Sequence, residues 1–462
     1  MKQKTLLATF SYEFVSLKQI LLYGILLFSQ VKNVGATVGE GWVVRVKNSG
    51  DESQLGIKGF VVESALDKNR RVFKIRGKTR AAVQNFVALG MNRQESDATS
   101  VATLLREMPD VEMAEENMIY RASSGAKRPQ VLREDLDVNQ KPNLNFLEVI
   151  PNDPYFQSLW GMRNRGQPVD FGSRGVEGAD IRATGAWVFE KGSEQVVVGI
   201  LDTGIDLNHE DLKDNLWTDN SGATPIHGFN AFDSSKTPQD DNGHGTHVAG
   251  TIGAVGDNGV GVSGVNWKVS IMAVKILNGD GDGDIAGIVA GIDWAVAHGA
   301  RVINASWGGG GASQIMSDAI SRAADEGVLF VAAAGNDGEN NDQVSSFPAN
   351  YALPNIVSVA ASDNQDQLAD FSNYGIKKVH IAAPGVSVIS TLPDNHYGAE
   401  SGTSMASPHV AGAAALLLSR SPNLSIAEIK AKIFSSADRL NSLKSKVSNG
   451  GARLNLMRLM KQ

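Results

Sequence analysis

Three side chains could together perform nucleophilic acyl transfer: Asp202, which ends a short apolar run, and His244 and Ser404, which lie where helices are expected to begin. A serine hydroxyl is a poor nucleophile until an imidazole accepts its proton, and a carboxylate fixes the tautomer of that imidazole. The charge that develops on an attacked carbonyl oxygen needs a hydrogen-bond donor, and Asn336 follows another apolar run. Ser404 also lies where a helix is expected to begin, so backbone N–H groups and the helix dipole favour the same developing charge. We therefore expect these four residues to converge.

The elements that must position these residues follow from the pattern after residue 150, where short apolar runs alternate with helix-like stretches. The strand-like runs are 196–201, 269–274, 302–305, 328–334 and 356–361, and the helix-like stretches include 285–298, 315–326 and 405–419. Strands that alternate with helices indicate an α/β fold, with a mostly parallel sheet flanked by helices on both faces. Ligands of such sheets bind at the carboxyl ends of the strands, where the polar residues lie.

Four segments resemble the signatures of the subtilisin-like serine proteases, the subtilases. They are D-T-G at 202–204, H-G-T-H-V-A-G at 244–250, A-G-N at 334–336 and G-T-S-M-A-S-P at 402–408, and the resemblance extends from about Pro151 to about Leu456. It implies a serine endopeptidase that hydrolyses polypeptides through an acyl-enzyme intermediate and needs no cofactor for catalysis. Asp202, His244 and Ser404 would be the triad, and Asn336 with the Ser404 backbone N–H would bind the oxyanion.

The same resemblance implies a groove in which an extended peptide is added as a strand between two segments of the enzyme. One wall would be Ser306, Trp307 and Gly308, the opposing strand would contain Gly281 and Gly283, and Ala333 and Gly335 would border the primary pocket. Trp307 stands where the family usually has another hydrophobic residue, so the resemblance does not fix the width of the pocket. Asp211 and Asp257 lie where family members bind a structural calcium ion.

Several other interpretations of these residues are weaker. His247 follows His244 by three residues, but H-E-x-x-H is absent and no third metal ligand suggests itself, so we expect a structural histidine. Residues 402–406 resemble a nucleophile elbow, yet no acid lies between Ser404 and His409, the last histidine, as that fold requires. The acidic loop 280–284 lacks the Gly and Glu of an EF-hand. It is either a solvated turn or a groove segment that prefers basic or small side chains upstream of the cut.

An alternative from a different functional class is a catalytically inactive relative that keeps the peptide groove without turnover. All four catalytic positions hold competent residue types, which argues against it.

The first 150 residues differ in character from the rest. The apolar run 20–28 has the length of a signal peptide core and is too short to span a bilayer, which predicts a signal peptide over 1–36. Residues 37–121 have the pattern of a small α+β unit, including a helix-like stretch at 81–89, and resemble the family's propeptide, a chaperone and inhibitor. Residues 122–150 read as an exposed linker that contains the processing site, and 151–462 as the catalytic domain.

Composition and charge narrow the functional classes. The chain of 462 residues has no cysteine, which excludes disulfides and a thiol nucleophile. Its net charge of −7 gives nucleic acid no attractive field. Residues 1–150 hold 21 basic and 17 acidic side chains, while 151–462 hold 22 and 33, so the two parts could attract each other. We expect a secreted monomer without a membrane anchor, whose partners are polypeptide substrates and its own propeptide.

Overall fold

The computed structural model describes residues 38–46, 60–67, 72–77, 105–106, 108, 111–123, 130–131, 148–169, 174–222 and 224–462. The expected signal peptide, the helix-like stretch 81–89 and most of the expected linker lie outside these residues. Within the described residues, no helix has the length and apolar character needed to cross a membrane.

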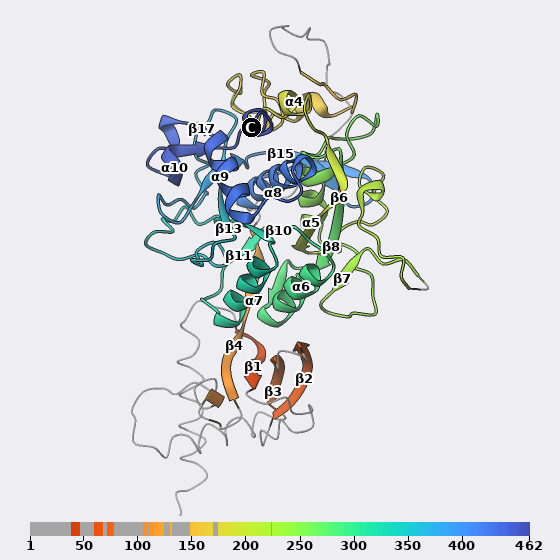
Figure 1. Cartoon of the computed structure of the whole chain (residues 1–462), viewed down its shortest axis with the longest axis vertical. Helices are drawn as coiled ribbons and strands as arrows, with labels where there is room; N and C mark the ends of the chain where they lie inside the picture. The colour runs from red at the N-terminus through yellow and green to blue at the C-terminus, as the bar shows by residue number, and fades with distance from the viewer. Residues whose placement is uncertain are drawn as a thin grey trace, which may run out of the picture.

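A nine-stranded sheet forms the centre of the catalytic unit (Figure 1). Its order is β17 (Asp438–Arg439), β18 (Ala452–Arg453), β14 (Ile381–Pro384), β13 (Ile356–Ser362), β12 (Leu329–Ala333), β10 (Val302–Ala305), β6 (Gly192–Asp202), β8 (Lys268–Lys275) and β7 (Gly228–Asn230). Every neighbouring pair is parallel except β17 with β18. The mostly parallel sheet expected from the sequence is therefore confirmed.

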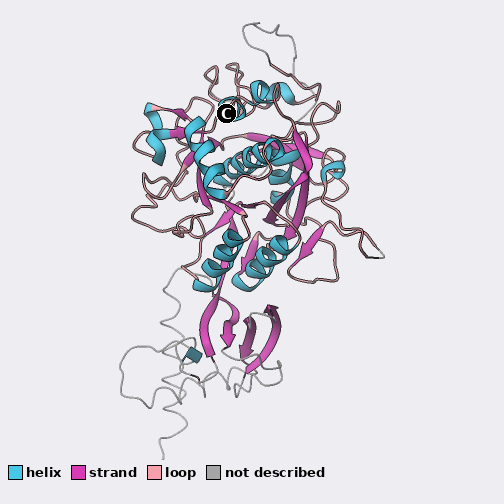
Figure 2. Cartoon of the chain, viewed as in Figure 1, coloured by secondary structure: helices cyan, strands magenta, loops and turns pink. Residues whose placement is uncertain are grey.

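Helices cover both faces of this sheet, because successive residues of its strands point to opposite sides. Ile200 of β6 belongs to the core beneath α5 (His244–Gly253), α8 (Thr403–Arg420) and α9 (Ile426–Ser436). The next residue, Leu201, belongs to a second core beneath α6 (Ile285–Ala297) and α7 (Gln314–Asp325). The two layers of helices can be followed in Figure 2.

Smaller elements complete the catalytic unit. A hairpin of β15 (Val388–Leu392) and β16 (His396–Glu400) is joined by β5 (Gln130–Val131) as a third strand. Short helices are α4 (Ala183–Ala186), α10 (Ser448–Gly451), α11 (Leu456–Met460), η3 (Phe156–Ser158), η4 (Lys213–Asn215) and η5 (Asn441–Leu443). The Glu148 carboxylate pairs with Arg163 at 2.5 Å, so the ordered contacts of the unit begin before residue 151.

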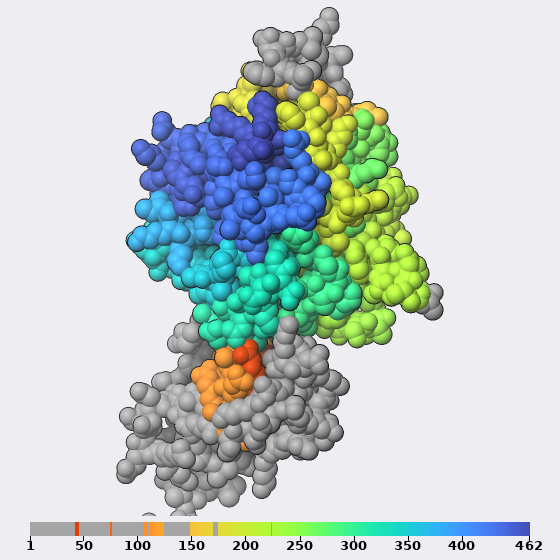
Figure 3. Space-filling view, viewed as in Figure 1, coloured from red at the N-terminus to blue at the C-terminus, as the bar shows by residue number. Residues whose placement is uncertain are grey.

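The N-terminal unit is joined to the catalytic unit by a shared sheet. Strands β1 (Val38–Val46), β2 (Phe60–Asp67), β3 (Val72–Gly77) and β4 (Val111–Ala122) are antiparallel in the order β4-β1-β3-β2. The end of β4 continues into the catalytic unit, where it pairs with β9 (Asp282–Asp284) and β11 (Trp307–Gly308). In Figures 1 and 3 this unit therefore packs directly against the end that carries α6 and α7.

Candidate active site

Asp202 and His244 are brought together in the buried interior. Asp202 is the last residue of β6 and His244 the first of α5, and the His244 Nδ1 lies 2.7 Å from the Asp202 Oδ1. The same oxygen accepts a hydrogen bond from the Thr203 N–H at 2.8 Å, which holds the carboxylate in place. Both side chains are buried, with exposed fractions of 0% and 3%. The sequence-predicted acid and base thus lie in contact.

The electrostatics of this pair set the protonation of the imidazole. Burial lowers the pKa of His244, but the Asp202 carboxylate favours the charged ring by attraction and by the hydrogen bond. The balance raises the pKa of His244 to about 9. The Nδ1 atom is therefore fixed as the donor to Asp202, which leaves Nε2 to exchange a proton with a nucleophile.

Ser404 is the second residue of α8, and this helix packs against α5, whose first residue is His244. Its Oγ donates a hydrogen bond to the Ser306 carbonyl oxygen at 2.8 Å. Among the described residues, the His244 Nε2 is buried and has no hydrogen-bond partner. A rotation of the Ser404 side chain away from Ser306 is therefore needed before the hydroxyl can give its proton to His244.

Asn336 points its amide at a carbonyl of the N-terminal unit. Its Nδ2 donates to the Ser123 carbonyl oxygen at 2.5 Å. Its Oδ1 accepts hydrogen bonds from the Thr403 N–H and hydroxyl, both at 2.9 Å, which fixes the orientation of the amide. The donor predicted for the oxyanion thus contacts the carbonyl of residue 123, beside the start of the helix that carries Ser404. Such an arrangement can stabilise negative charge on a carbonyl oxygen under attack.

The expected groove is occupied by the end of β4, which lies between β9 and β11 as an antiparallel strand. Gly283 of β9 pairs with Tyr120 of β4, and Gly308 of β11 pairs with Arg121 of β4. The Ala122 N–H donates to the Gly281 carbonyl at 2.9 Å, and the Ser123 N–H donates to the Ser306 carbonyl at 3.0 Å. The predicted groove residues Gly281, Gly283, Ser306 and Gly308 are therefore brought together around one extended segment.

The Trp307 ring packs against Tyr120 of the strand that fills the groove. The indole is fully buried, its Nε1 donates to the Leu201 carbonyl at 2.9 Å, and Tyr120 meets it edge-on with the ring centres 5.8 Å apart. The Tyr120 hydroxyl donates to the Gly311 carbonyl at 2.7 Å. The indole thus forms the floor beneath Tyr120, and sequence reasoning did not single out this tyrosine. The sequence feature that could have pointed to Tyr120 is the strand-like pattern at the end of the N-terminal unit.

Of the residues predicted for the primary pocket, Gly308 lies close to Ser123. A Cβ added at Gly308 would lie 3.6 Å from the Ser123 hydroxyl, which leaves room for a small side chain there. The Gly335 N–H donates to the Thr403 hydroxyl at 3.2 Å. Its backbone φ is +112°, a conformation that glycine adopts at little energetic cost because it has no Cβ. Ala333 is the last residue of β12 and is buried.

Comparison with known proteins decides the family. A model described as the subtilase family matches residues 193–452 of this chain. The chain belongs to the subtilase family. It is 43% identical to subtilisin DY of Bacillus licheniformis over 275 residues, 59% of this chain and 93% of the relative. It is 38% identical to thermitase of Thermoactinomyces vulgaris over 291 residues, 63% of this chain and 92% of the relative.

A third relative, alkaline elastase YaB of Bacillus sp. (strain YaB), is 38% identical over 311 residues, 67% of this chain and 73% of the relative. As a subtilase, the protein is a serine endopeptidase that acts on polypeptides. Catalysis in this family needs no cofactor.

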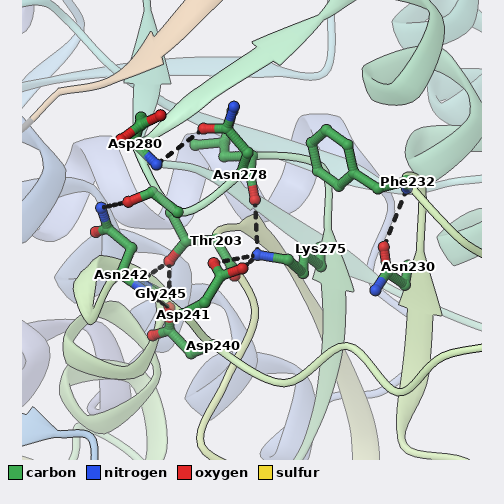
Figure 4. Close-up of polar contacts among 12 residues, drawn as sticks. Thr203, Asn230, Phe232, Asp240, Asp241, Asn242, Gly245, Lys275, Asn278 and Asp280 are labelled. Carbon is green, nitrogen blue, oxygen red and sulfur yellow. Dashed lines mark hydrogen bonds and ion pairs between the residues drawn. The ribbon is translucent and has the colours of Figure 1, made fainter.

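Lys275 ties together the loops that carry the predicted acid and base of this subtilase. It is the last residue of β8, directly beside Asp202 in the parallel register. Its buried Nζ donates to the carbonyls of Thr203 at 2.6 Å and Leu277 at 3.0 Å, and pairs with the Asp241 carboxylate at 2.6 Å (Figure 4). Sequence reasoning missed this residue, although a single cation ending an apolar strand was visible.

His247 faces backbone atoms rather than a metal site. Its Nε2 lies 2.9 Å from the Val388 carbonyl and 3.2 Å from the Gly398 carbonyl, so this nitrogen is the donor. Burial lowers the pKa of His247, which keeps the ring neutral. The structural role expected from the sequence agrees with these contacts.

The two acids predicted to bind calcium use their carboxylates differently. Asp257 accepts from the Asn152 N–H on an exposed loop. Asp211 is buried and accepts from the Asn258 amide and the Val262 N–H, both at 2.9 Å. Asp153, which was not predicted, is a further buried acid, and its carboxylate accepts from the Asp257 and Asn258 N–H groups at 2.9 and 3.1 Å.

Burial and the neighbouring Asp153 raise the pKa of Asp211 to about 7. Within the described part of the chain, no Lys or Arg forms an ion pair with Asp153 or Asp211, and no cluster of three acidic or histidine side chains forms a metal site. The Asp153 carboxylate already accepts from the Asp257 and Asn258 N–H groups and from the Ser263 hydroxyl, so a calcium ion would bind here only by replacing such donors.

Proposed function

We propose that Asp202, His244, Ser404 and Asn336 carry the peptidase reaction, as acid, base, nucleophile and oxyanion donor. One observation carries this assignment: the His244 Nδ1 lies 2.7 Å from Asp202, and the other nitrogen of the ring, Nε2, is buried without a partner among the described residues. Asn336 in turn donates to the Ser123 carbonyl of the strand that fills the groove.

The reaction begins when the Ser404 hydroxyl turns to the His244 Nε2 and loses its proton as Oγ attacks the scissile carbonyl carbon. Asp202 remains ionised and stabilises the imidazolium through the Nδ1–H bond. Asn336 and the first N–H groups of α8 bind the oxygen that becomes negative. The imidazolium then protonates the leaving amine, and water attacks the acyl-serine with His244 again as the base.

The precursor is self-inhibited, with the N-terminal unit ending in the groove as a bound strand. The Ser123 carbonyl occupies the place of a scissile carbonyl, so we propose that the enzyme cuts its own chain between Ser123 and Ser124. This cut lies at the start of the expected linker. The monomer then keeps its own N-terminal unit as an inhibitory partner until that unit is released.

Contacts from β4 to the starts of two helices support this inhibition. The Glu115 carboxylate accepts from the Gln314 N–H at 2.8 Å at the first residue of α7. The Asn117 side chain accepts from the Ala286 N–H at 3.2 Å near the start of α6. Both groups satisfy N–H donors that have no partner within their helices. We also infer export through a signal peptide over 1–36, and structural calcium at the two acids expected from the sequence, Asp211 and Asp257.

The direct test is the processing of purified precursor. Wild-type protein is expected to release a fragment whose new N-terminus is Ser124, as read by N-terminal sequencing. Ser404→Ala should stop this cut, whereas Ser401→Ala, a matched serine of the same loop, should still be processed. Treatment of the processed enzyme with an organophosphate should add mass on Ser404. A Ser404→Ala precursor that is processed at the wild-type rate, free of other proteases, would refute the proposal.

A further inference from the structure

We propose that Asp282 makes the substrate groove select a basic side chain at the third position upstream, counting the residue whose carbonyl is attacked as the first. The inference deepens the proposed function and rests on its placement of Ser123 at the first position. Arg121 then occupies the third position in the precursor.

The strand register places Asp282 opposite this third position. Arg121 stands directly opposite Asp282 in the antiparallel pair of β4 and β9. The Arg121 Nε donates to the Asp282 Oδ1 at 2.7 Å. Arg121 is otherwise mostly exposed, with 64% of its side chain accessible, so little packing would discriminate between residues there. The carboxylate of Asp282 is thus the group that can distinguish side chains at this position.

The backbone of Asp282 is held by its own loop rather than by the N-terminal unit. The Asn278 side chain accepts from the Asp282 N–H at 3.0 Å, and the Asn278 N–H donates to the Asp282 carbonyl at 2.9 Å. Among the described residues, the only hydrogen-bond partner of the Asp282 carboxylate is Arg121. When the N-terminal unit leaves, the loop keeps its shape and the carboxylate becomes available to a substrate.

The two neighbouring acids of the loop differ from Asp282. Asp284 caps the start of α6 by accepting from the Gly287 N–H at 2.8 Å, and also binds Lys74 at 2.9 Å. Asp280 is exposed and has no ion pair among the described residues. Asp280 therefore offers a matched control, because its replacement removes the same charge from the same loop without touching the third position.

The test compares peptides cut by the processed enzyme. Fluorogenic peptides carry the chain's own sequence 120–124, Tyr-Xaa-Ala-Ser-Ser, with Arg, Lys, Gln or Glu as Xaa. A solvent-exposed ion pair of this geometry predicts a kcat/KM for Arg and Lys about two- to fivefold above that for Gln, with Glu lower still. The preference should shrink as salt is added.

Variants assign the preference to one side chain. Asp282→Asn should bring the Arg-to-Gln ratio to about one, and Asp282→Lys should favour Glu over Arg. Asp280→Asn should keep the wild-type ratio. Because each ratio is measured within one enzyme, a general loss of activity in a variant cancels.

Mass spectrometry of the products separates the two hypotheses. Equal kcat/KM for Arg, Gln and Glu with cleavage at the Ser–Ser bond would overturn the role of Asp282 alone, as would an Arg preference that survives Asp282→Asn and Asp282→Lys. Cleavage at another bond would overturn the counting of positions and with it this inference. Hydrolysis that persists in Ser404→Ala would overturn the proposed function.

Discussion

Tyr120→Ala should weaken the hold of the N-terminal unit on the catalytic unit about a hundredfold. The Tyr120 side chain is fully buried, meets Trp307 edge-on and donates to the Gly311 carbonyl. Truncation of a buried aromatic side chain to Ala costs roughly 3–5 kcal/mol. We take about 3 kcal/mol, because the pocket opens to water once the unit leaves, and each 1.4 kcal/mol corresponds to about a tenfold change in the dissociation constant.

The dissociation constant can be measured on the protein after its own processing. The cut complex is diluted in steps, and the initial rate of hydrolysis of a fluorogenic peptide reports the released fraction. Tyr120→Phe keeps the ring and removes only the hydroxyl, so its constant should rise about fivefold, as expected for one lost hydrogen bond of about 1 kcal/mol. Thermal melting of Ser404→Ala precursors with each substitution checks that they fold.

Two results would refute this reasoning. Complexes of wild type and Tyr120→Ala that dissociate over the same dilution range would show that the buried ring does not anchor the strand. Equal losses for Tyr120→Phe and Tyr120→Ala would assign the anchoring to the hydroxyl rather than to burial.

Three further predictions concern the catalytic residues and calcium. Asn336→Leu should lower kcat about 10²–10³-fold and leave KM nearly unchanged, a magnitude known for the oxyanion donor of subtilisins rather than worked out from this structure. Steady-state kinetics in which a higher KM accounts for the loss of activity would contradict this prediction. In a Ser404→Ala precursor, the NMR titration of His244 should have its midpoint at about 9. Asp202→Asn should lower that midpoint, because burial is then opposed only by the smaller attraction of Glu400 and Asp240. Since the pKa of folded His244 lies above its unfolded value, its contribution to the free energy of unfolding is present below about pH 6.5 and lost as the pH rises through about 9. Calcium should raise the thermal midpoint of wild type relative to EDTA but not that of Asp211→Asn, and equal gains in both would count against the proposed ligand.

The composition already indicated opposite net charges in the two parts of the chain, and the structure shows which charged side chains meet. Among the described residues, three ion pairs join basic residues of the N-terminal unit to acids around α6 and α7. They are Arg45 with Asp318 at 2.7 Å, Lys74 with Asp284 at 2.9 Å, and Arg121 with Asp282 at 2.7 Å. Because these ion pairs are partly exposed, they contribute modestly to the binding free energy and affect the rate of association more than its strength.

Much of the catalytic unit could be predicted because its strands are buried on both faces and its helices are amphipathic or apolar over their full length. The expected strand at 302–305 coincides with β10, and the expected helix at 285–298 differs from α6 by one residue. The short strands β17 and β18 were not expected, since two residues carry no periodic pattern. Strand β4 ends at Ala122, and the boundary of the N-terminal unit expected at 121 stays a prediction.

The sequence alone determined the residue types of the reaction and the class of fold, because local motifs and hydrophobic periodicity are properties of neighbouring residues. It also determined the charge contrast between the two parts of the chain. Only the tertiary structure decided that Tyr120 is an anchor, that Lys275 ties two loops together and that Arg121 meets Asp282. These contacts join residues 34 to 191 positions apart, and such distant partners are chosen by strand register and packing, which no local pattern encodes.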